Sequence, residues 1–424
     1  MEKEKRDYIS DIKKGSVFLQ GWVHETRDLT KIKFVLLRDM TGIIQCIIKD
    51  ESLFKIFSQL TIESVVAIKG NIRDAMVKSP EVTNKNIEVE VKEIEIINKA
   101  EALPITVVEK GIETALPKRL DYRSIDLRKQ RTKAIFVIQG EIANSFRKFF
   151  YDNKFIEIQS PDIIASSSEG GTELFEVKYF EKKAYLAQSP QLYKQLAAIA
   201  LEKVFCLVPV WRAEKHNTTR HLNESRQMDI EVAFADDIQV MEILAECVQF
   251  MISNVIKNCS KELEILNVKL KVPKAVYLTY EEAIKKVNGK LGDDFSPEQE
   301  KKLCDLYPDA IVFTHSWPCD LKPFYIWPKD EKKKISAGFD ALYNGIEISS
   351  GGQRVHKADI LIKQLRAKGL NPKNFESYIN AFRYGAPYHS GWSIGLERFT
   401  MALLGLDNIR EACMFPRDRE RLTP

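Results

Sequence analysis

Five short stretches of strand-forming residues lie within the first hundred positions, and residues that break strands separate them. In the last stretch, Ile87, Val89 and Val91 alternate with acidic residues, so one face meets a core and the other meets water. The residues at 39–42, Asp-Met-Thr-Gly, are typical of a turn between two strands. The pattern predicts a small all-β module.

Five strands in fewer than one hundred residues favour a small barrel, and the oligonucleotide-binding (OB) fold is the leading candidate. Beyond it the periodicity fades, and Pro104 and Pro117 accompany a run of mixed charges, which indicates a hinge. Apolar residues then recur at helical spacing over 133–153. We therefore divide the chain into a barrel domain at 1–100, a hinge region at 101–131 and a larger domain at 132–424.

The larger domain mixes many strands with fewer helices that could act as crossovers. This ratio favours a mainly antiparallel sheet flanked by helices over a doubly wound parallel sheet, so the predicted fold class is α+β. Neither G-x-G-x-x-G nor G-x-x-x-x-G-K-[ST] occurs in the sequence. If the domain binds ATP, side chains must hold the phosphates.

Composition excludes several classes of protein. Hydrophobic residues make up 44% and charged residues 29%, which is typical of a globular chain and not of a disordered or fibrous one. Lys and Arg number 64 against 60 Asp and Glu, so any nucleic-acid binding must come from local patches. No uncharged apolar run approaches the ~20 residues that span a bilayer. We expect a cytoplasmic protein with no membrane partner, whose seven cysteines are buried thiols.

Two segments carry side chains suited to phosphate binding. Arg212 ends an apolar strand, and Arg220 and His221 follow on a loop, where they could close over the distal phosphates of a nucleotide. The alternative is a solvated hairpin tip. Near the end of the chain, a strand passes through Gly395 into a helix with Arg398 in its first turn, which could reach a phosphate or a base. This segment is equally consistent with a structural junction.

Three further clusters could bind substrates or a metal. Asp340 and Glu347 near the ends of a strand pair offer the oxygen ligands that Mg²⁺ prefers, and Arg354 is suited to a second carboxylate. Lys194 lies one turn into a helix that opens at a proline, where the alternative is a solvated helix face. The Gly-rich stretch 168–173 could act as a lid or be simply flexible.

The order of these clusters resembles the three signatures of class II aminoacyl-tRNA synthetases, and the preceding barrel resembles the aspartate, asparagine and lysine subgroup. The strings SSEGGTELF, AQSPQLYKQ, RAEKHNTTRHLNE, FDALYNGIEISSGGQRVH and MFPRDRERLTP are similar to archaeal-type aspartyl enzymes, over essentially the whole chain. The resemblance implies that L-aspartate and ATP form aspartyl-adenylate and pyrophosphate. The adenosine at the tRNA end then attacks the adenylate, without a covalent enzyme intermediate.

The resemblance also implies roles for individual residues. The catalytic residues are Arg212, Glu214 and Arg398, with Arg212 bridging the aspartate α-carboxylate and the α-phosphate. Aspartate is bound by Glu169, Gln191, Lys194, Arg212, Asp229, Ser350 and Arg354. ATP is bound by Arg212, Glu214, Arg220, His221, Leu222, Glu347, Gly395, Leu396, Glu397 and Arg398. Mg²⁺ is held by Glu347, Ser350 and Asp340.

In the barrel, the resemblance implies that Phe34 stacks on and Gln45 reads anticodon bases, although Phe34 could instead be a core residue. His24 stands where archaeal enzymes that discriminate between tRNAs carry Trp, and Pro80 lies in a loop that helps to read the third anticodon base. The implied partners are tRNA(Asp) and also tRNA(Asn). A homodimer that packs through 158–161 is implied as well.

Two rival interpretations stay open. Asparaginyl-tRNA synthetases share the architecture, but the cations Lys194 and Arg354 and the Arg417-Asp418 ending argue against that specificity. A non-catalytic, synthetase-like nucleic-acid-binding protein would have no need of the complete set of charged site residues. The chain departs from the family pattern at Ser393, where the family has glycine, and at Tyr388, where it has proline.

Overall fold

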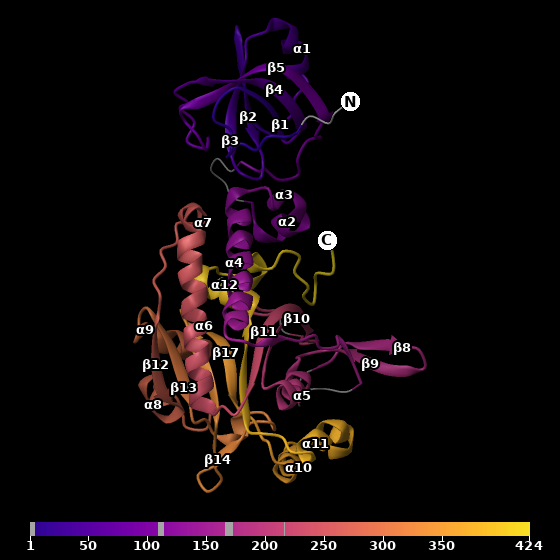
Figure 1. Cartoon of the computed structure of the whole chain (residues 1–424), viewed down its shortest axis with the longest axis vertical. Coiled ribbons are helices and arrows are strands. Elements are labelled where there is room, and N and C mark those ends of the chain that lie inside the picture. Colours follow the sequence, from indigo (N-terminus) through magenta and orange to yellow (C-terminus); the bar gives the residue numbers. More distant parts are fainter. Residues whose placement is uncertain (1–4, 109–113, 166–172, 216) are drawn as a thin grey trace. The chain divides into compact units, whose positions relative to one another are not determined.

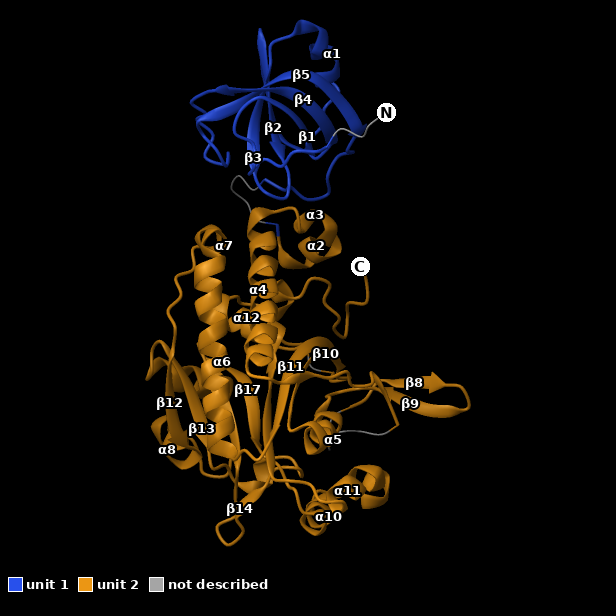
Figure 2. Cartoon of the chain, in the orientation of Figure 1, with its two compact units in different colours: residues 1–114 blue, residues 115–424 orange. Residues whose placement is uncertain are grey.

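The computed structural model describes residues 5–108, 114–165, 173–215 and 217–424. The chain divides into two compact units, residues 1–114 and 115–424 (Figure 2). The division falls inside the segment that the sequence predicts as a hinge.

Unit 1 is a closed five-stranded barrel with the strand order β1-β2-β3-β5-β4. Its strands are β1 (Ser16–Leu29), β2 (Ile32–Arg38), β3 (Ile43–Ile48), β4 (Val65–Asp74) and β5 (Ile87–Asn98). The β3–β5 pair is parallel and the other pairs are antiparallel. A 3-10 turn at Glu51–Leu53 and the short helix α1 (Phe54–Phe57) connect β3 to β4. The predicted OB-type barrel is confirmed.

The predicted turn between β2 and β3 is present, and Asp39 explains its stability. The Asp39 Oδ1 atom accepts hydrogen bonds from the backbone N–H groups of Thr41, at 2.7 Å, and Gly42, at 3.0 Å. The side chain thus replaces backbone partners that a tight turn lacks. The barrel interior is filled by alternate apolar residues of the strands, among them Val23, Val35 and Val89, each with no exposed surface.

Unit 2 is built on an eight-stranded sheet with the order β12-β13-β16-β17-β18-β11-β10-β6. The strands are β6 (Ile156–Glu157), β10 (Lys203–Trp211), β11 (Glu224–Ala233), β12 (Lys274–Thr279), β13 (Ala310–His315), β16 (Gly338–Tyr343), β17 (Ile346–Gln353) and β18 (His389–Gly395). The two outer pairs, β12–β13 and β10–β6, are parallel, and the five pairs between them are antiparallel. The predicted α+β class is confirmed.

Helices α4 (Gln130–Asp152), α6 (Asp237–Asn258) and α12 (Leu396–Leu404) contribute the apolar side chains that pack with the sheet in the main core (Figure 1). Among the described helices, α6 alone is long and apolar enough to cross a membrane. Its apolar side chains, such as Met251 and Ile252, are fully buried in that core. This is the environment of the central helix of a globular unit.

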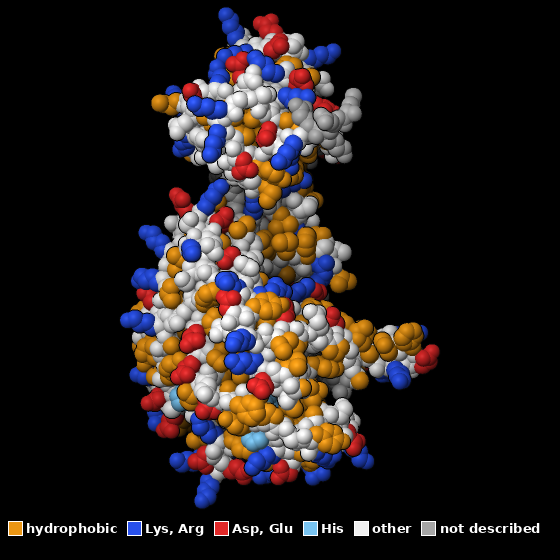
Figure 3. All heavy atoms as spheres, viewed as in Figure 1, with side chains coloured by type: hydrophobic (Ala, Val, Ile, Leu, Met, Phe, Trp, Pro, Cys, Tyr) orange, Lys and Arg blue, Asp and Glu red, His pale blue; other side chains and the backbone are white. Residues whose placement is uncertain are grey.

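The remaining elements of unit 2 lie around the eight-stranded sheet and these three helices. They are α2 (Leu116–Asp121), α3 (Arg123–Asp126), β7 (Ile163–Ile164), β8 (Glu176–Tyr179), β9 (Lys182–Leu186), α5 (Gln191–Leu201), α7 (Ser260–Leu266), α8 (Tyr280–Lys286), α9 (Pro297–Asp305), β14 (Pro328–Asp330), β15 (Ile335–Ser336), α10 (Ala358–Ala367) and α11 (Glu376–Arg383), with 3-10 turns at Cys319–Leu321, Pro372–Phe375 and Ile409–Ala412. The second half of the predicted hinge is therefore helical. On the face drawn in Figure 3, cationic and anionic side chains are interspersed over both units, as the net charge of +4 suggests.

Candidate active site

The hairpin formed by β10 and β11 positions the first group of candidate residues. The strands are paired as far as Trp211 and Glu224. Asn223 joins the two ends of the loop between them by hydrogen bonds. The side-chain amide of Asn223 donates to the carbonyls of Arg212, at 2.7 Å, and Glu214, at 3.0 Å, and the backbone carbonyl of Asn223 accepts from the Arg212 N–H at 2.9 Å. Arg212 and Glu214 are thus fixed at the base of the loop.

Neighbouring strands of the sheet bring the other candidate residues to the same place. β18 lies next to β11, with Ser393 opposite Asp229, and β17 lies next to β18, with Ser350 opposite Ser393. α5 packs against β10 and β11. Together these elements enclose a cavity of about 370 Å³.

Most of the predicted substrate-binding residues line this cavity. They are Gln191, Lys194, Arg212, Glu214, Arg220, His221, Leu222, Asp229, Glu347, Ser350, Arg354, Gly395, Glu397 and Arg398. Three others do not appear in the lining. Glu169 lies outside the described residues, Leu396 packs in the main core, and Asp340, on β16, contacts the lining residue Lys322.

Two ion pairs form one end of the cavity. The Lys194 Nζ atom donates to Asp229 Oδ1 at 2.6 Å and to the Trp392 carbonyl at 3.1 Å. The Arg354 Nε and Nη2 atoms donate to the two carboxylate oxygens of Glu231, at 2.8 and 3.2 Å. All four charged side chains are at most 3% exposed. Their charges are compensated within the protein, as buried charges must be.

Electrostatics at this end favour an ionised Glu231. Burial raises the pKa of this carboxyl group, but the adjacent charges of Arg354 and Lys194 outweigh burial and hold its pKa below the usual value. The hydrogen bonds to Glu231 use Nε and Nη2 of Arg354. Within the described residues the Nη1 group of this guanidinium has no hydrogen-bond partner, so it is available to a ligand.

Another part of the lining is acidic. Burial, followed by the charge of Asp340, raises the pKa of Glu347 to about 7. Asp340 itself accepts a hydrogen bond from the Lys322 Nζ atom at 2.5 Å, and Lys322 lines the cavity. A cation bound next to Glu347 would favour the ionised form of this carboxyl group.

The loop side chains Arg220 and His221 also line the cavity. Arg220 contacts Glu300 of α9, with 3.1 Å between Nη1 and Oε2. His221 Nδ1 and the Thr218 hydroxyl are 2.5 Å apart, and the same hydroxyl accepts from the Arg220 N–H at 3.2 Å. On α12, burial raises the pKa of Glu397 to about 7, and its carboxylate accepts from the Arg226 N–H.

Comparisons with known proteins agree with this arrangement. Residues 116–419 match the family described as tRNA synthetases class II (D, K and N), and residues 17–97 match the OB-fold nucleic acid binding domain. The chain belongs to the class II tRNA synthetases. The resemblance seen in the sequence is thereby confirmed, including its archaeal aspartyl type, as the relatives below indicate.

The curated relatives of this class II synthetase include the aspartate--tRNA(Asp/Asn) ligases of Archaeoglobus fulgidus and Methanocaldococcus jannaschii. The first is 42% identical and the alignment covers 99% of this chain and 100% of the relative; the second is 43% identical, with 100% and 99% covered. Among solved structures, asparaginyl-tRNA synthetase from Pyrococcus horikoshii has a TM-score of 0.91 at 31% identity, covering 99% and 100% of the two chains. Aspartyl-tRNA synthetase from Entamoeba histolytica has a TM-score of 0.88 at 30% identity, covering 99% and 93%.

Sequence reasoning missed several residues that line the synthetase cavity. Gln227 and Ser349 are among them, and each has a buried side-chain oxygen that lacks a hydrogen-bond partner in the described parts of the chain. Gln227 lies two positions before Asp229 on β11, so the period of two along a strand could have placed it on the same face. Lys322 follows a 3-10 turn and belongs to no motif, so no signal in the sequence indicates it.

The barrel of the synthetase has its own smaller cavity, of about 170 Å³, and both Phe34 and Gln45 line it. Phe34 is half-buried and belongs to β2, so its ring is not part of the barrel core. His24 is buried elsewhere, with Nδ1 at 3.0 Å from Arg38 and Nε2 at 3.3 Å from Glu81. Neither His24 nor Pro80 lines this cavity.

Proposed function

We propose that the chain attaches L-aspartate to tRNA by way of aspartyl-adenylate. The observation that carries this proposal is the convergence of Arg212, Arg398 and the Lys194–Arg354 cation pair on one cavity, although 186 positions separate the first two along the chain (398 minus 212). This set of charges suits an acidic amino acid placed against ATP. The curated relatives that bear the name aspartate--tRNA(Asp/Asn) ligase support it.

Positioning and charge neutralisation are sufficient for the first step. The aspartate α-carboxylate attacks the α-phosphorus of ATP, the bond to the β-phosphate oxygen breaks, and pyrophosphate leaves. Arg212 donates to both anions and so offsets their repulsion as they approach. Glu214 accepts from the adenine amino group, Arg220 and His221 hold the distal phosphates, and Arg398 contacts the adenine or the γ-phosphate.

A magnesium ion fits the acidic wall. Glu347 faces the cavity with a carboxyl group whose pKa is raised by burial and by Asp340, and the Ser350 side chain is exposed on the same strand. Bound there, Mg²⁺ would neutralise phosphate charge. The described residues contain no cluster of three or more His, Cys, Asp or Glu side chains able to hold a metal, so phosphate oxygens and water would complete the coordination.

Specificity for aspartate over asparagine follows from the hydrogen-bond donors at the amino-acid end of the cavity. Lys194 and Arg354 carry only hydrogen-bond donors, and Asp229 and Glu231 hold them in place. A carboxylate accepts from both cations, whereas an amide would turn N–H groups toward them in a desolvated site. Gln191 and Asp229, together with Glu169, are the acceptors proposed for the substrate ammonium group.

Both tRNA(Asp) and tRNA(Asn) are the proposed nucleic-acid partners. Phe34 and Gln45 line one cavity on the barrel, where a base can stack on the ring and be read by the amide. His24 and Pro80 are the residues proposed to relax reading of the third anticodon base. In this assignment residues 1–100 bind the anticodon, 101–131 connect the domains and 132–424 carry out catalysis.

We further propose a cytoplasmic homodimer. β6 is an edge strand of the sheet, and its Ile156 is 47% exposed beside Tyr151, which is 55% exposed. Apolar side chains on a short edge strand next to 158–161 suit a two-fold contact. Light scattering of the purified chain should give twice its mass of 48.8 kDa, and a monomer at micromolar concentration would contradict this part of the proposal.

The decisive test is ATP–pyrophosphate exchange with each amino acid. We expect exchange with L-aspartate and none above background with L-asparagine. The structural likeness to asparaginyl-tRNA synthetase makes that specificity the second candidate, and exchange with asparagine alone would establish it. No exchange with any amino acid would favour the non-catalytic interpretation.

A further inference from the structure

The segment 408–421, here called the C-terminal brace, contacts the loop that carries Arg220 and His221. The brace lies almost two hundred positions after that loop in the sequence, yet two backbone hydrogen bonds and the side chains of Arg410 and Arg419 join them, the latter donating to the Lys215 carbonyl at 3.2 Å. The Ile409 N–H donates to the Thr219 carbonyl at 2.9 Å, and the Asn223 N–H donates to the Arg417 carbonyl at 2.8 Å.

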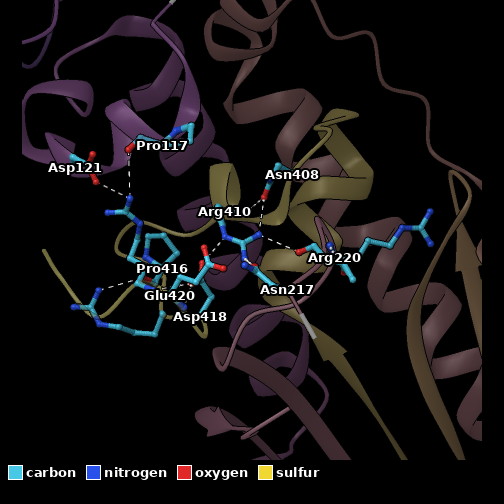
Figure 4. A network of polar contacts seen from close by, with 12 residues as sticks. Pro117, Asp121, Asn217, Arg220, Asn408, Arg410, Pro416, Asp418 and Glu420 are labelled. Carbon is cyan, nitrogen blue, oxygen red and sulfur yellow. Dashed lines mark hydrogen bonds and ion pairs between the residues drawn. The ribbon is translucent and has the colours of Figure 1, made fainter. Parts of the chain in front are cut away.

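Arg410 is the centre of this contact. Its Nη2 atom donates to Asn217 Oδ1 at 2.6 Å and its Nη1 atom donates to the Thr218 carbonyl at 3.0 Å. Its Nε atom donates to Asp418 Oδ2 at 2.5 Å. Figure 4 shows the guanidinium between Asp418 and Asn217, while Arg220 of the same loop extends away from it.

Asp418 is built to hold this guanidinium. Its Oδ1 atom accepts from the N–H groups of Glu420 and Arg421, at 2.9 and 2.8 Å, so the other oxygen is directed at Arg410. Both side chains of the pair are nearly buried, at 11% and 8% exposure. Burial raises the pKa of Asp418, but the hydrogen bonds from Arg410 and the two N–H groups outweigh it, so the pKa lies below its usual value.

Thr218 connects Arg410 to the two loop residues that line the cavity. Its carbonyl is fixed by Arg410, and its hydroxyl contacts His221 Nδ1 and accepts from the Arg220 N–H. Arg220 and His221 both line the cavity, as does Ile409 of the brace. A displacement of Thr218 would therefore move the two side chains that face the phosphates.

We propose that Arg410, held by Asp418, is a positioning residue for ATP: it fixes the loop at 217–223 so that Arg220 and His221 meet the triphosphate. This inference rests on the proposed assignment of those two residues to the ATP phosphates. Arg410 does not line the cavity. Its planar guanidinium donates to four acceptors, the fourth being Asn408 Oδ1 at 3.3 Å, whereas a lysine ammonium group has only three N–H donors.

The test is steady-state exchange kinetics of the full chain with Arg410→Gln, Arg410→Lys and Asp418→Asn. Losing a charge-assisted hydrogen bond of the positioning residue should raise the KM for ATP about tenfold in Arg410→Gln. Arg410→Lys should recover little of this, and Asp418→Asn should cost less. The KM for aspartate should stay within about twofold in each, because the partners of Lys194 and Arg354 are Asp229, the Trp392 carbonyl and Glu231, which lie outside the loop.

The matched control is Arg421→Gln. Arg421 belongs to the same brace, but its side chain contacts Asp121 and the Pro117 carbonyl in α2, and not the loop. Its substitution should leave the KM for ATP unchanged. An equal rise in Arg421→Gln, or a parallel rise in the KM for aspartate, would show a general structural role and overturn the proposal.

Two further experiments test the same contact: a double-mutant cycle of Arg410 and Asp418, and a substitution of the exposed residue Asn217. Because Arg410 and Asp418 act through one contact, Arg410→Gln with Asp418→Asn should be no worse than Arg410→Gln alone. If Arg410 variants do not fold, Asn217→Ala removes the exposed loop acceptor and should still raise the KM for ATP about threefold. An unchanged KM for ATP in Arg410→Gln, or in Asn217→Ala if that variant must replace it, overturns the proposal.

The stabilisation of the folded chain by ATP separates this inference from the proposed function. The rise in Tm on adding ATP with Mg²⁺ should be smaller in Arg410→Gln than in the wild-type chain. Absence of aspartate-dependent exchange in the wild type would refute the proposed function alone, if the smaller Tm rise persists. An identical Tm rise in both proteins would refute the role of Arg410.

Discussion

At the scale of single residues, Lys194 shows how a buried charge is kept available to a substrate. It lies on the first turn of α5 with 1% of its side chain exposed, and it donates to Asp229 and to the Trp392 carbonyl. Removing one partner of a buried hydrogen-bonded charge pair costs about 2–5 kcal/mol, because the other charge is left without compensation. Because the ammonium group of Lys194 is also proposed to bind the aspartate carboxylate, we expect a loss of the same size in the free energy of substrate binding.

Lys194→Leu is therefore expected to raise the KM for aspartate about 100-fold, since each 1.4 kcal/mol corresponds to a factor of ten. The KM for ATP should change little, because the phosphates are assigned to the other side of the cavity. Exchange kinetics measure both values. Lys182→Leu, at an exposed position on β9, is the matched control, and unchanged aspartate kinetics in Lys194→Leu would refute the assignment.

Glu397 provides a prediction about pH. Burial raises its pKa from 4.5 to about 7, so the folded chain holds this proton more tightly than the unfolded chain. Its contribution to stability is therefore greatest below about pH 4.5, falls as the pH rises to about 7 and is constant above that. Glu397→Gln stays neutral and can still accept from Arg226, so its stability relative to the wild type should increase from pH 5 to pH 8.

Urea unfolding of both proteins across this pH range measures the difference in the free energy of unfolding. A difference that does not change with pH would show that Glu397 is ionised in the folded chain throughout.

The chemistry of single residues was easier to predict than their partners. Lys194 and Arg354 were identified as cations of the site, but their pairing with Asp229 and Glu231 was not. These pairs depend on how α5 and β17 pack against β11, and local sequence patterns carry no information about such distant contacts. Lys322 was missed for the same reason.

At the scale of elements, the close approach of β18 to β11 depends on Gly391. A Cβ atom at this position would overlap the Glu231 carboxylate and the Ile230 carbonyl. Gly391 is paired with Glu231 on one side and with Gly352 on the other, so neither neighbour can withdraw without breaking the sheet. The strand that carries Ser393 to the cavity is positioned by this contact.

Gly391→Ala is expected to destabilise the fold by about 1–3 kcal/mol through overpacking, and to lower activity by displacing Glu231 from Arg354. Gly140→Ala in α4 is the matched control, because a Cβ atom there meets open space. It should stabilise the chain by about 0.5–1 kcal/mol, as helix propensity predicts. Urea unfolding measures both changes, and an unaltered stability of Gly391→Ala would contradict the steric account.

Elements with strong periodicity were predicted closely. The helix expected at 133–153 is α4 at Gln130–Asp152. The sequence instead predicts a hinge around Arg123, yet this charged stretch forms α2 and α3. Arg123 is 1% exposed and donates to the carbonyls of Cys413 and Met414, which lie about 290 residues away, so only the folded chain reveals its burial.

At the scale of the whole molecule, two compact units divide the proposed work. Unit 1 is a barrel with an aromatic side chain in a small surface cavity, and unit 2 holds the charged cavity that suits aspartate and ATP. The net charge of +4 gives little general attraction to a polyanion, so tRNA binding must come from local contacts on each unit. The sequence predicted both folds because strand alternation and family strings extend along nearly the whole chain.

His24 is the residue through which tRNA selection is tested in unit 1. It is buried against Arg38, and burial followed by the Arg38 charge lowers its pKa, so the ring is neutral near pH 7. His24→Trp should reduce aspartylation of tRNA(Asn) by at least about tenfold, a change of about 1.4 kcal/mol, while tRNA(Asp) is retained. Equal charging of both tRNAs by this variant would remove His24 from the account of specificity.

The most direct measurement is aminoacylation of separate tRNA(Asp) and tRNA(Asn) transcripts by the full chain, with labelled aspartate or labelled asparagine. We expect aspartate to be attached to both transcripts and asparagine to neither. Attachment of asparagine, or no attachment of aspartate to tRNA(Asp), would contradict the proposal that the cavity of unit 2 activates aspartate for tRNA.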